Sequence, residues 1–315
     1  GVKGMPGPEH HGLKRGDWTD DTDQMILLMN TITECRGTFS TRLFAKKLLN
    51  WSRHGFSELG DLTGSGMGRL TAEVMRNEHY LENPTKVASE VHKQLGGNSA
   101  PNGAVMRCGI SGALPTWEAT SILQAKTTHA DSRCIYSSWL ISGLCHAYIF
   151  GDKSQMIRVD QDALRSGIST QPVQSAQPDN RYASASNSNT PGEYVEPYDE
   201  PGEDMYDEDH VSEEKALPNR TKINIAPYIR AALTMLPENK NKRELGKYLN
   251  IHNSCLSDHL NLAELDNSAT RGYTLKTLSC GLYAMRNIQA FDGRESPTNM
   301  YRRILLEIIN CAGVV

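Results

Sequence analysis

The chain has 315 residues, a formal net charge of -4 and an apolar fraction of 38%. This length suits one large or two medium domains, and this apolar fraction supports a buried core. The small charge argues against proteins that track nucleic acid or bind anionic membranes, so we expect neither as a partner. No stretch is long and apolar enough to cross a bilayer, and we find no apolar core of a signal peptide near the N-terminus.

The cysteines are scattered singly, and no Cys-x-x-Cys pair occurs. Several lie inside apolar, helix-patterned segments, which predicts buried thiols in a reducing compartment rather than a disulfide framework or a zinc site. We therefore expect a cytoplasmic location, with the nucleus as the alternative. The seven residues are Cys35, Cys108, Cys134, Cys145, Cys255, Cys280 and Cys311.

Apolar residues recur with helical spacing along most of the chain, whereas alternating strand patterns are essentially missing. Ser40 and Asp131 are candidate N-caps, and Pro84 and Gly96-Gly97 bound another predicted helix. We therefore predict an all-α fold with short, Gly-rich connections. The stripes expected to face the core are Met25, Leu28, Met29 and Ile32; Leu43, Phe44, Leu48 and Trp51; Val87, Val91 and Leu95; and Ile135, Trp139, Ser142, Cys145 and Ile149. Later helices are expected at 225–236, 243–250, 255–265, 274–288 and 298–310.

One segment departs from this pattern. Residues 166–215 are rich in Ser, Gln, Asn, Pro and Tyr, and the stretch Glu193–Glu214 is acidic without a Lys or Arg. Such a composition buries too little apolar surface to offset the entropy of ordering, which predicts a disordered, low-complexity insertion. Its serines and tyrosines are candidates for phosphorylation or for binding a basic partner, and the alternative is a tolerated surface insertion without a role.

An acidic block, Trp18-Thr19-Asp20-Asp21-Thr22-Asp23, begins the first helical pattern. Carboxylates this close raise one another's pKa unless a cation, hydrogen-bond donors or water compensate, and a hard cation such as Mg²⁺ or Ca²⁺ prefers oxygen ligands of this kind. The alternative is a helix cap, with Asp21 accepting backbone amides and Gln24 as its capping-box partner. The block does not match the calcium loop of an EF-hand.

A glycine-rich loop, Thr63-Gly64-Ser65-Gly66-Met67-Gly68, joins two helical segments. Alternating glycines let backbone amides approach an anion such as a diphosphate closely, and the alternative is a flexible turn. No strand precedes the loop, which argues against a dinucleotide-binding fold of the Rossmann type.

Two further polar turns come later. In the first, which spans residues 98–107, Ser99 and Asn102 are able to bind hydroxyl or phosphate oxygens, or only to cap and turn the chain. In the second, Thr128-His129-Ala130-Asp131, a single histidine is more often a capping or a hydrogen-bonded structural residue than a catalyst.

These motifs, in this order and spacing, resemble the ADP-ribosylglycohydrolase family of the dinitrogenase-reductase-activating glycohydrolase type. The resemblance runs from about Gly16 to Gly313, apart from the acidic insertion. A late motif, Arg271-Gly272-Tyr273-Thr274-Leu275-Lys276 followed by Leu282-Tyr283-Ala284, is similar to the fungal branch. The other motifs are Thr19-Asp20-Asp21-Thr22, Gly64-x-Gly66-x-Gly68, Pro101-Asn102-Gly103-Ala104-x-Met106-Arg107 and Thr128-His129-x-Asp131.

The resemblance implies a single domain over residues 1–315, folded as an orthogonal helical bundle with two Mg²⁺ ions, or sometimes Mn²⁺, in a central cleft. It implies hydrolysis of the bond between ADP-ribose and a protein side chain, or of related ADP-ribose conjugates, so ADP-ribose or an ADP-ribosylated protein is the expected partner. The implied metal ligands are Thr19, Asp20 and Asp21, of which Asp20 and Asp21 are also the implied catalytic residues. The implied substrate-binding residues are Gly64, Ser65, Gly66, Met67, Gly68 and Ser99 for the diphosphate, Asn102 and Gly103 for the ribose, and His129 and Tyr273 for the adenosine.

Members of this family complete the metal site with an Asp-x-Asp-(Thr/Ser) block after an Ala-Gly pair, and they begin with a Gly-Asp-Ala-(Leu/Met)-Gly helix. Here Ala312-Gly313 is followed by Val314-Val315. We therefore expect either a fragment of an enzyme or a degenerate member, and weak Mg²⁺ affinity without turnover for the chain as given. The alternative function is an inactive or crystallin-like relative that at most binds ADP-ribose.

Overall fold

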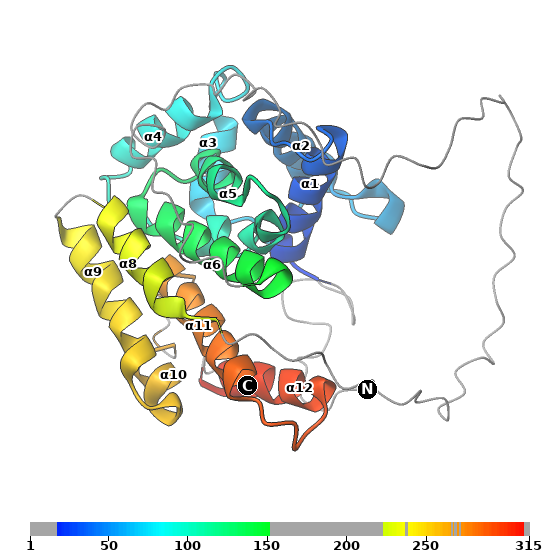
Figure 1. The fold of residues 1–315 in the computed structure, drawn as a ribbon. Helices are drawn as coiled ribbons and strands as arrows, with labels where there is room; N and C mark the ends of the chain where they lie inside the picture. Colours follow the sequence, from blue (N-terminus) through cyan, green and yellow to red (C-terminus); the bar gives the residue numbers. More distant parts are fainter. Residues whose placement is uncertain are drawn as a thin grey trace, which may run out of the picture. The chain divides into compact units, whose positions relative to one another are not determined.

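All regular elements in the described part of the chain are helices, as Figure 1 shows. The computed structural model describes residues 18–151, 223–236, 239–265, 267, 270 and 272–311. These residues belong to one unit, and the predicted insertion at 166–215 lies outside them. Within the described residues, β pairing outside strands is limited to an isolated antiparallel bridge between Pro101 and Tyr273. The predicted all-α class is confirmed.

Most predicted helices form close to their expected bounds. The side chain of Ser40 accepts from the amide of Leu43, and that of Asp131 accepts from the amide of Arg133, so both predicted N-caps are present. The α-helices are α1 (Asp20–Glu34), α2 (Thr41–His54), α3 (Arg69–Arg76), α4 (Pro84–Gln94), α5 (Trp117–Lys126), α6 (Ser132–Phe150), α8 (Ile225–Met235), α9 (Lys240–Asn250), α10 (His259–Leu262), α11 (Thr274–Ala290) and α12 (Pro297–Cys311). Short 3₁₀ turns are η1 (Ser57–Leu59), η2 (Asn102–Ala104), η3 (Cys108–Ala113), η5 (Ile251–Asn253) and η6 (Leu256–Asp258).

One predicted helix forms differently in the structure, and one observed helix was not predicted. The helix predicted at 255–265 is split, because the chain forms the short turn η6 and then only one turn of α-helix, α10. Helix α5 was not expected, because it buries polar residues (Thr120, Ser121 and Gln124) together with apolar ones and so lacks a clean apolar stripe.

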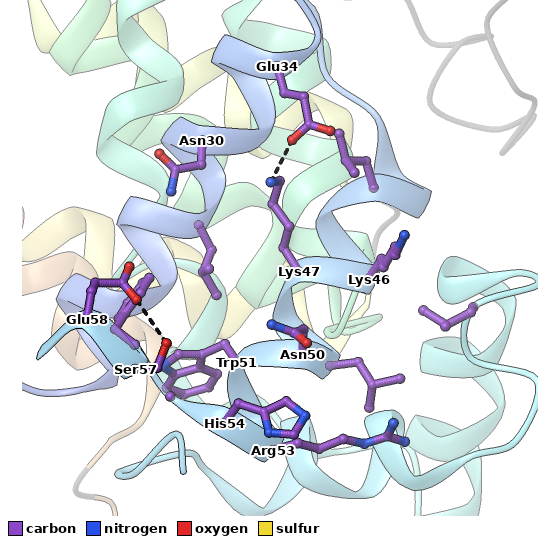
Figure 2. A pocket seen from close by; sticks show the side chains of 16 residues that line it. Asn30, Glu34, Lys46, Lys47, Asn50, Trp51, Arg53, His54, Ser57 and Glu58 are labelled. Atoms are coloured by element: carbon purple, nitrogen blue, oxygen red, sulfur yellow. Dashed lines mark hydrogen bonds and ion pairs between the residues drawn. The ribbon is translucent and has the colours of Figure 1, made fainter. Parts of the chain in front are cut away.

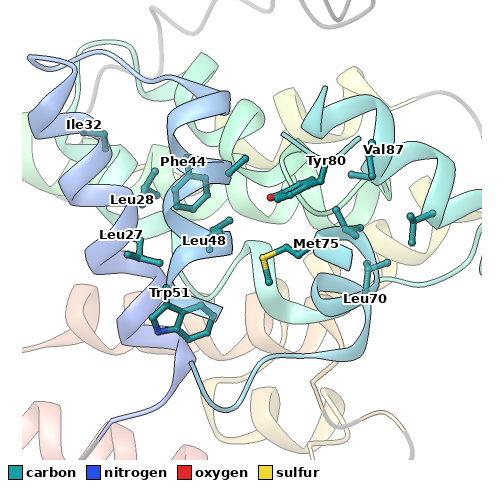
Figure 3. Packing of buried hydrophobic residues seen from close by; sticks show 14 residues of the cluster. Leu27, Leu28, Ile32, Phe44, Leu48, Trp51, Leu70, Met75, Tyr80 and Val87 are labelled. Carbon is teal, nitrogen blue, oxygen red and sulfur yellow. The ribbon is translucent and has the colours of Figure 1, made fainter. Parts of the chain in front are cut away.

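A first apolar core lies among α1, α2, α3 and α4 (Figure 3). Phe44, Leu48 and Trp51 are buried in it as predicted. The inward face of α1, however, is rotated from the predicted one: Met25 and Met29 are 37% and 44% exposed. The buried positions of this helix are Asp20, Asp23, Gln24, Leu27, Leu28, Thr31 and Ile32. Polar residues thus continue the buried face, which a stripe drawn from apolar residues alone misplaces.

Two other predicted core positions are at the surface. Leu95 is 36% exposed because it follows the last residue of α4, where the chain turns through Gly96 and Gly97 with positive φ. Ile149 is 56% exposed near the end of α6.

Helix α6 packs against α5, α8, α9 and α11 and against the turn η3. Close packing explains its small residues: a β-carbon on Gly143 would lie 2.7 Å from the Trp117 ring. A second apolar cluster, which includes Leu260, Tyr283 and Ile304, joins α10, α11 and α12. None of the helices in the described residues has the length and apolarity needed to span a membrane.

Candidate functional site

The acidic block forms the beginning of α1. Thr19, with an extended backbone, is the N-cap, and its carbonyl accepts from the amides of Thr22 and Asp23. The Thr19 hydroxyl donates to Asp21 Oδ2 at 2.7 Å. Thr19 rather than Asp21 is therefore the N-cap, and Gln24 is not a capping-box partner, because its amide is bonded to Asp20 and Arg107.

Asp23 braces the start of α1 against α2. Its Oδ1 accepts from the indole of Trp18 at 2.8 Å, and its Oδ2 accepts from the indole of Trp51 at 2.9 Å. Trp51 in turn lies against the start of the glycine loop: a β-carbon on Gly64 would be 2.7 Å from its ring, and the Gly64 amide donates to the Trp51 carbonyl. Asp23 thus has a structural role, and it positions the loop through Trp51.

The glycine loop reaches the acidic block directly. Gly66 has φ +81°, and a β-carbon there would lie 2.9 Å from Asp20 Oδ1. Gly68 is the N-cap of α3, Ser65 is exposed, and Met67 packs against the first apolar core. The structure therefore brings two predicted motifs into contact, with the side chain of Met67 directed to the core.

Asp20 is buried, 8% exposed, beside two other carboxylates. Burial and the negative charges of Asp21 and Asp23 raise the pKa of Asp20 from 3.8 to about 7, against the opposing effect of Arg107. Such a shift means that the site favours a proton or another positive charge next to this carboxylate.

The polar turn at residues 98–107 lies beside the late motif around Tyr273. The amide of Asn102 donates to the Gly272 carbonyl at 2.7 Å, and the amide of Thr274 donates to the Ala100 carbonyl at 3.0 Å. Gly103 faces His129: a β-carbon there would lie 2.9 Å from Cε1 and 3.1 Å from Nε2 of its ring. The structure thus brings Asn102 and Gly103 together with His129 and Tyr273, which are distant from them in the sequence.

Arg133 joins this region to α9. It donates to both oxygens of Asp131, at 2.9 and 2.8 Å, and to Glu244 Oε2 at 2.9 Å. It also donates to the Tyr273 hydroxyl at 3.1 Å and to Asn98. This arrangement holds Tyr273 and the loop that contains Ser99 against the beginning of α6.

The buried side chain of Arg107 connects α1 with the turn that contains Thr128. Its guanidinium donates to Gln24 Oε1 at 2.7 Å and to Thr128 Oγ1 at 2.8 Å, and it lies 5.0 Å from the Phe44 ring centroid. Burial lowers its pKa to about 10, so it remains charged at neutral pH. The sequence marks Arg107 only as part of a motif, but its place within an apolar segment is a signal of a specific buried role.

His129 is fully buried next to Arg107. Its Nδ1 lies 2.7 Å from Thr128 Oγ1, while its Nε2 is a buried atom without a hydrogen-bond partner in the described structure. Burial and the positive charges of Arg107 and His92 lower the pKa of His129 well below 6.5, so the ring is neutral. The N-cap of α6 is Asp131 rather than His129, and an unpaired buried nitrogen costs free energy unless it gains a hydrogen-bond partner.

The hydroxyl of Thr19 and the carboxylates of Asp20 and Asp21 are hard oxygen donors of the kind that Mg²⁺ prefers. Among the residues that the structure describes, no three His, Cys, Asp or Glu side chains gather as a metal site. A cavity of about 760 Å³ between α1 and α2, lined by Lys46, Lys47 and Arg53 among others, contains none of the predicted site residues (Figure 2). The candidate site is therefore the region where the motif loops meet.

Comparisons with known proteins agree with the motifs. The profile of the ADP-ribosylglycohydrolase family matches residues 1–314. The chain is 25% identical over 170 residues to the ADP-ribosylarginine hydrolase Tri1 of Pseudomonas putida (strain GB-1). That match covers 52% of this chain and 44% of the relative, so the chain spans less than half of the relative's length. No solved structure matches it. Because the family profile extends over nearly every residue, the chain belongs to the ADP-ribosylglycohydrolase family.

Proposed function

We propose that this protein binds ADP-ribose and hydrolyses its bond to a protein side chain or a related conjugate in a Mg²⁺-dependent reaction. The observation that carries the proposal is the contact between Gly66 and Asp20, which brings an anion-binding type of loop to a carboxylate that favours a positive charge. Family membership supports the reaction class, and the similarity to an ADP-ribosylarginine hydrolase makes arginine the first linkage to test.

The proposed assignments follow the loops. Backbone amides from Ser65 to Gly68 and the Ser99 hydroxyl bind the diphosphate, because exposed N–H groups in a glycine-rich turn match its charge and size. The Gly64 amide is bonded to the Trp51 carbonyl, so Gly64 positions the loop instead. Asn102 and Gly103 contact the ribose. His129 and Tyr273 border the adenosine, and their contacts with Thr128 and Arg133 keep both rings in place before the ligand binds.

The donor chemistry of Thr19, Asp20 and Asp21 fits Mg²⁺, with Mn²⁺ as a substitute, and these are the residues that would hold the ion. When bound, Mg²⁺ supplies Lewis acidity, which orients the ribose hydroxyls and activates water for attack at the anomeric carbon. Asp20 is held by the Gln24 amide at 3.2 Å, and Asp21 by the Thr19 hydroxyl, so both carboxylates have defined orientations.

Two measurements test the proposal. Calorimetry with ADP-ribose reports binding, and release of ADP-ribose from arginine-modified protein, with and without Mg²⁺, reports turnover. Release by the wild type would overrule the expectation of no turnover that the sequence raised. We expect Asp20→Ala to abolish such release, while Glu90→Gln on the exposed surface of α4 leaves binding and release unchanged. Absence of both binding and release in the wild-type chain would refute the proposal. Binding without release would favour the alternative of an inactive, ADP-ribose-binding relative.

A further inference from the structure

We infer that Arg107 is a positioning residue that acts through two neighbouring side chains, Thr128 and Gln24. Through Thr128 it fixes neutral His129 as the tautomer with its proton on Nε2, and through Gln24 it directs a hydrogen-bond donor to Asp20. The inference deepens the proposed function, because it concerns the groups that the ligand would meet. The tautomer itself is a property of the ligand-free protein.

The guanidinium of Arg107 only donates hydrogen bonds. Arg107 Nε and Nη2 donate to Gln124 Oε1 and to the Gln124 carbonyl at 2.9 and 2.8 Å. The other partners, Gln24 and Thr128, must likewise present an oxygen to it. A buried arginine thus determines which atom of each neighbouring polar side chain faces it and which atom faces away.

Gln24 shows the first consequence. Its Oε1 lies 2.7 Å from Arg107 Nη1, so the other atom of the amide, Nε2, faces Asp20 Oδ2 at 3.2 Å. The reversed amide would place an NH₂ group against the guanidinium and an oxygen against the carboxylate, and both contacts would be repulsive. Arg107 therefore supplies Asp20 with a donor although it does not touch it.

Thr128 shows the second consequence. Its Oγ1 accepts from Arg107 Nη2 at 2.8 Å, which leaves the hydroxyl proton available for His129 Nδ1 at 2.7 Å. In this assignment Nδ1 is an acceptor. Because the ring is neutral, its single proton is then on Nε2.

The position of Nε2 shows where this proton is directed. Nε2 is buried and without a partner in the described structure, and it would lie 3.1 Å from a β-carbon on Gly103. The ring therefore presents a donor beside the turn that contains Asn102 and Gly103. A group that binds there has to offer an acceptor, such as a hydroxyl or phosphate oxygen, rather than a donor.

The tautomer is measured by two-bond ¹H–¹⁵N correlation on protein with ¹⁵N-labelled histidine, with the His129 signals assigned from His129→Gln. We expect the Nε2–H form in the wild type and in Thr128→Ser, which retains the hydroxyl. Thr128→Val removes the donor to Nδ1, so the Nδ1–H form should become populated. The matched control is Thr127→Val: the Thr127 hydroxyl donates to the Leu123 carbonyl of α5, so this variant should keep the wild-type tautomer.

An Nδ1–H ring in the wild type, or an unchanged tautomer in Thr128→Val, would overturn the inference. These conservative variants avoid Arg107 itself, whose replacement threatens folding. A second readout is affinity for ADP-ribose, which should fall about tenfold in Thr128→Val and stay at the wild-type value in Thr128→Ser and Thr127→Val. If the wild type does not bind ADP-ribose, the proposed function fails, and the tautomer still decides the inference.

Discussion

The backbone of Gly66 lies so close to the Asp20 carboxylate that a β-carbon at residue 66 would approach Oδ1 to 2.9 Å. Gly66 also has φ +81°, a backbone conformation that side chains other than glycine rarely adopt. Close approach and positive φ therefore require glycine here for two independent reasons. The contact joins the glycine loop to the start of α1.

Gly66→Ala should accordingly displace the loop from Asp20. We expect a loss of about 1–2 kcal/mol in unfolding free energy and at least about tenfold weaker ADP-ribose binding. Gly109→Ala is the control, because Gly109 lies outside the loop and a β-carbon there would make only an ordinary contact with the Cys145 sulfur, at 3.9 Å. Urea denaturation and calorimetry measure the two effects, and equal behaviour of the two variants would contradict the importance of this contact.

Gly103→Ala tests the second loop. Its β-carbon would lie 2.9 Å from Cε1 of His129, so either the ring or the turn must move. We expect about 1–3 kcal/mol of destabilisation and a change in the His129 NMR signals. At Gly109 a β-carbon would meet only the Cys145 sulfur at 3.9 Å, so Gly109→Ala should leave those signals unchanged.

The raised pKa of Asp20 predicts a dependence of stability on pH. Between pH 3.8 and about 7 the folded protein binds the Asp20 proton more tightly than the unfolded chain does. Stability from this group is therefore present below pH 3.8 and is lost as pH rises to about 7. Asp20→Asn should be more stable than the wild type at pH 8, by about 1–2 kcal/mol, and no more stable at pH 4. Chemical denaturation across this range checks the sign, and an advantage that is independent of pH would contradict it.

Binding of Mg²⁺ should offset the stability that is lost when the Asp20 carboxylate ionises. At pH 8 a millimolar concentration of the ion should raise the Tm of the wild type, because an ion bound only by the folded state stabilises it by mass action. Asp20→Asn should show no such rise. Ca²⁺ and a monovalent salt at matched ionic strength serve as controls for selectivity and screening. Equal increases in both proteins would indicate a non-specific effect.

The Arg133 contacts predict an order of stability effects. Asp131→Asn removes the buried one of the two carboxylates that pair with Arg133, and only the partly exposed Glu244 remains, so the variant should cost about 3 kcal/mol. Tyr273→Phe removes one hydroxyl contact with Arg133 and should cost about 1 kcal/mol. Urea denaturation measures both, and a larger loss in Tyr273→Phe would contradict the assigned roles.

Local features could be predicted from the sequence alone because they depend on neighbouring residues. The caps Ser40 and Asp131, the start of α4 at Pro84 and the apolar face of α2 all involve side chains within one or two turns of each other. The all-α class follows from the same periodicity. The motifs also identified the family by their resemblance to it, although the roles of the individual site residues remain proposals.

Contacts between distant residues were decided only by the tertiary structure. Gln24 and Arg107 are 83 positions apart, and no local pattern states that the Gln24 amide is bonded to that arginine instead of capping its own helix. The same long-range contacts buried Gln24 on α1 and left Met25 and Met29 exposed. The physical reason is that a buried charge requires specific hydrogen-bond partners wherever the fold brings them, whereas apolar periodicity records only a preference for burial.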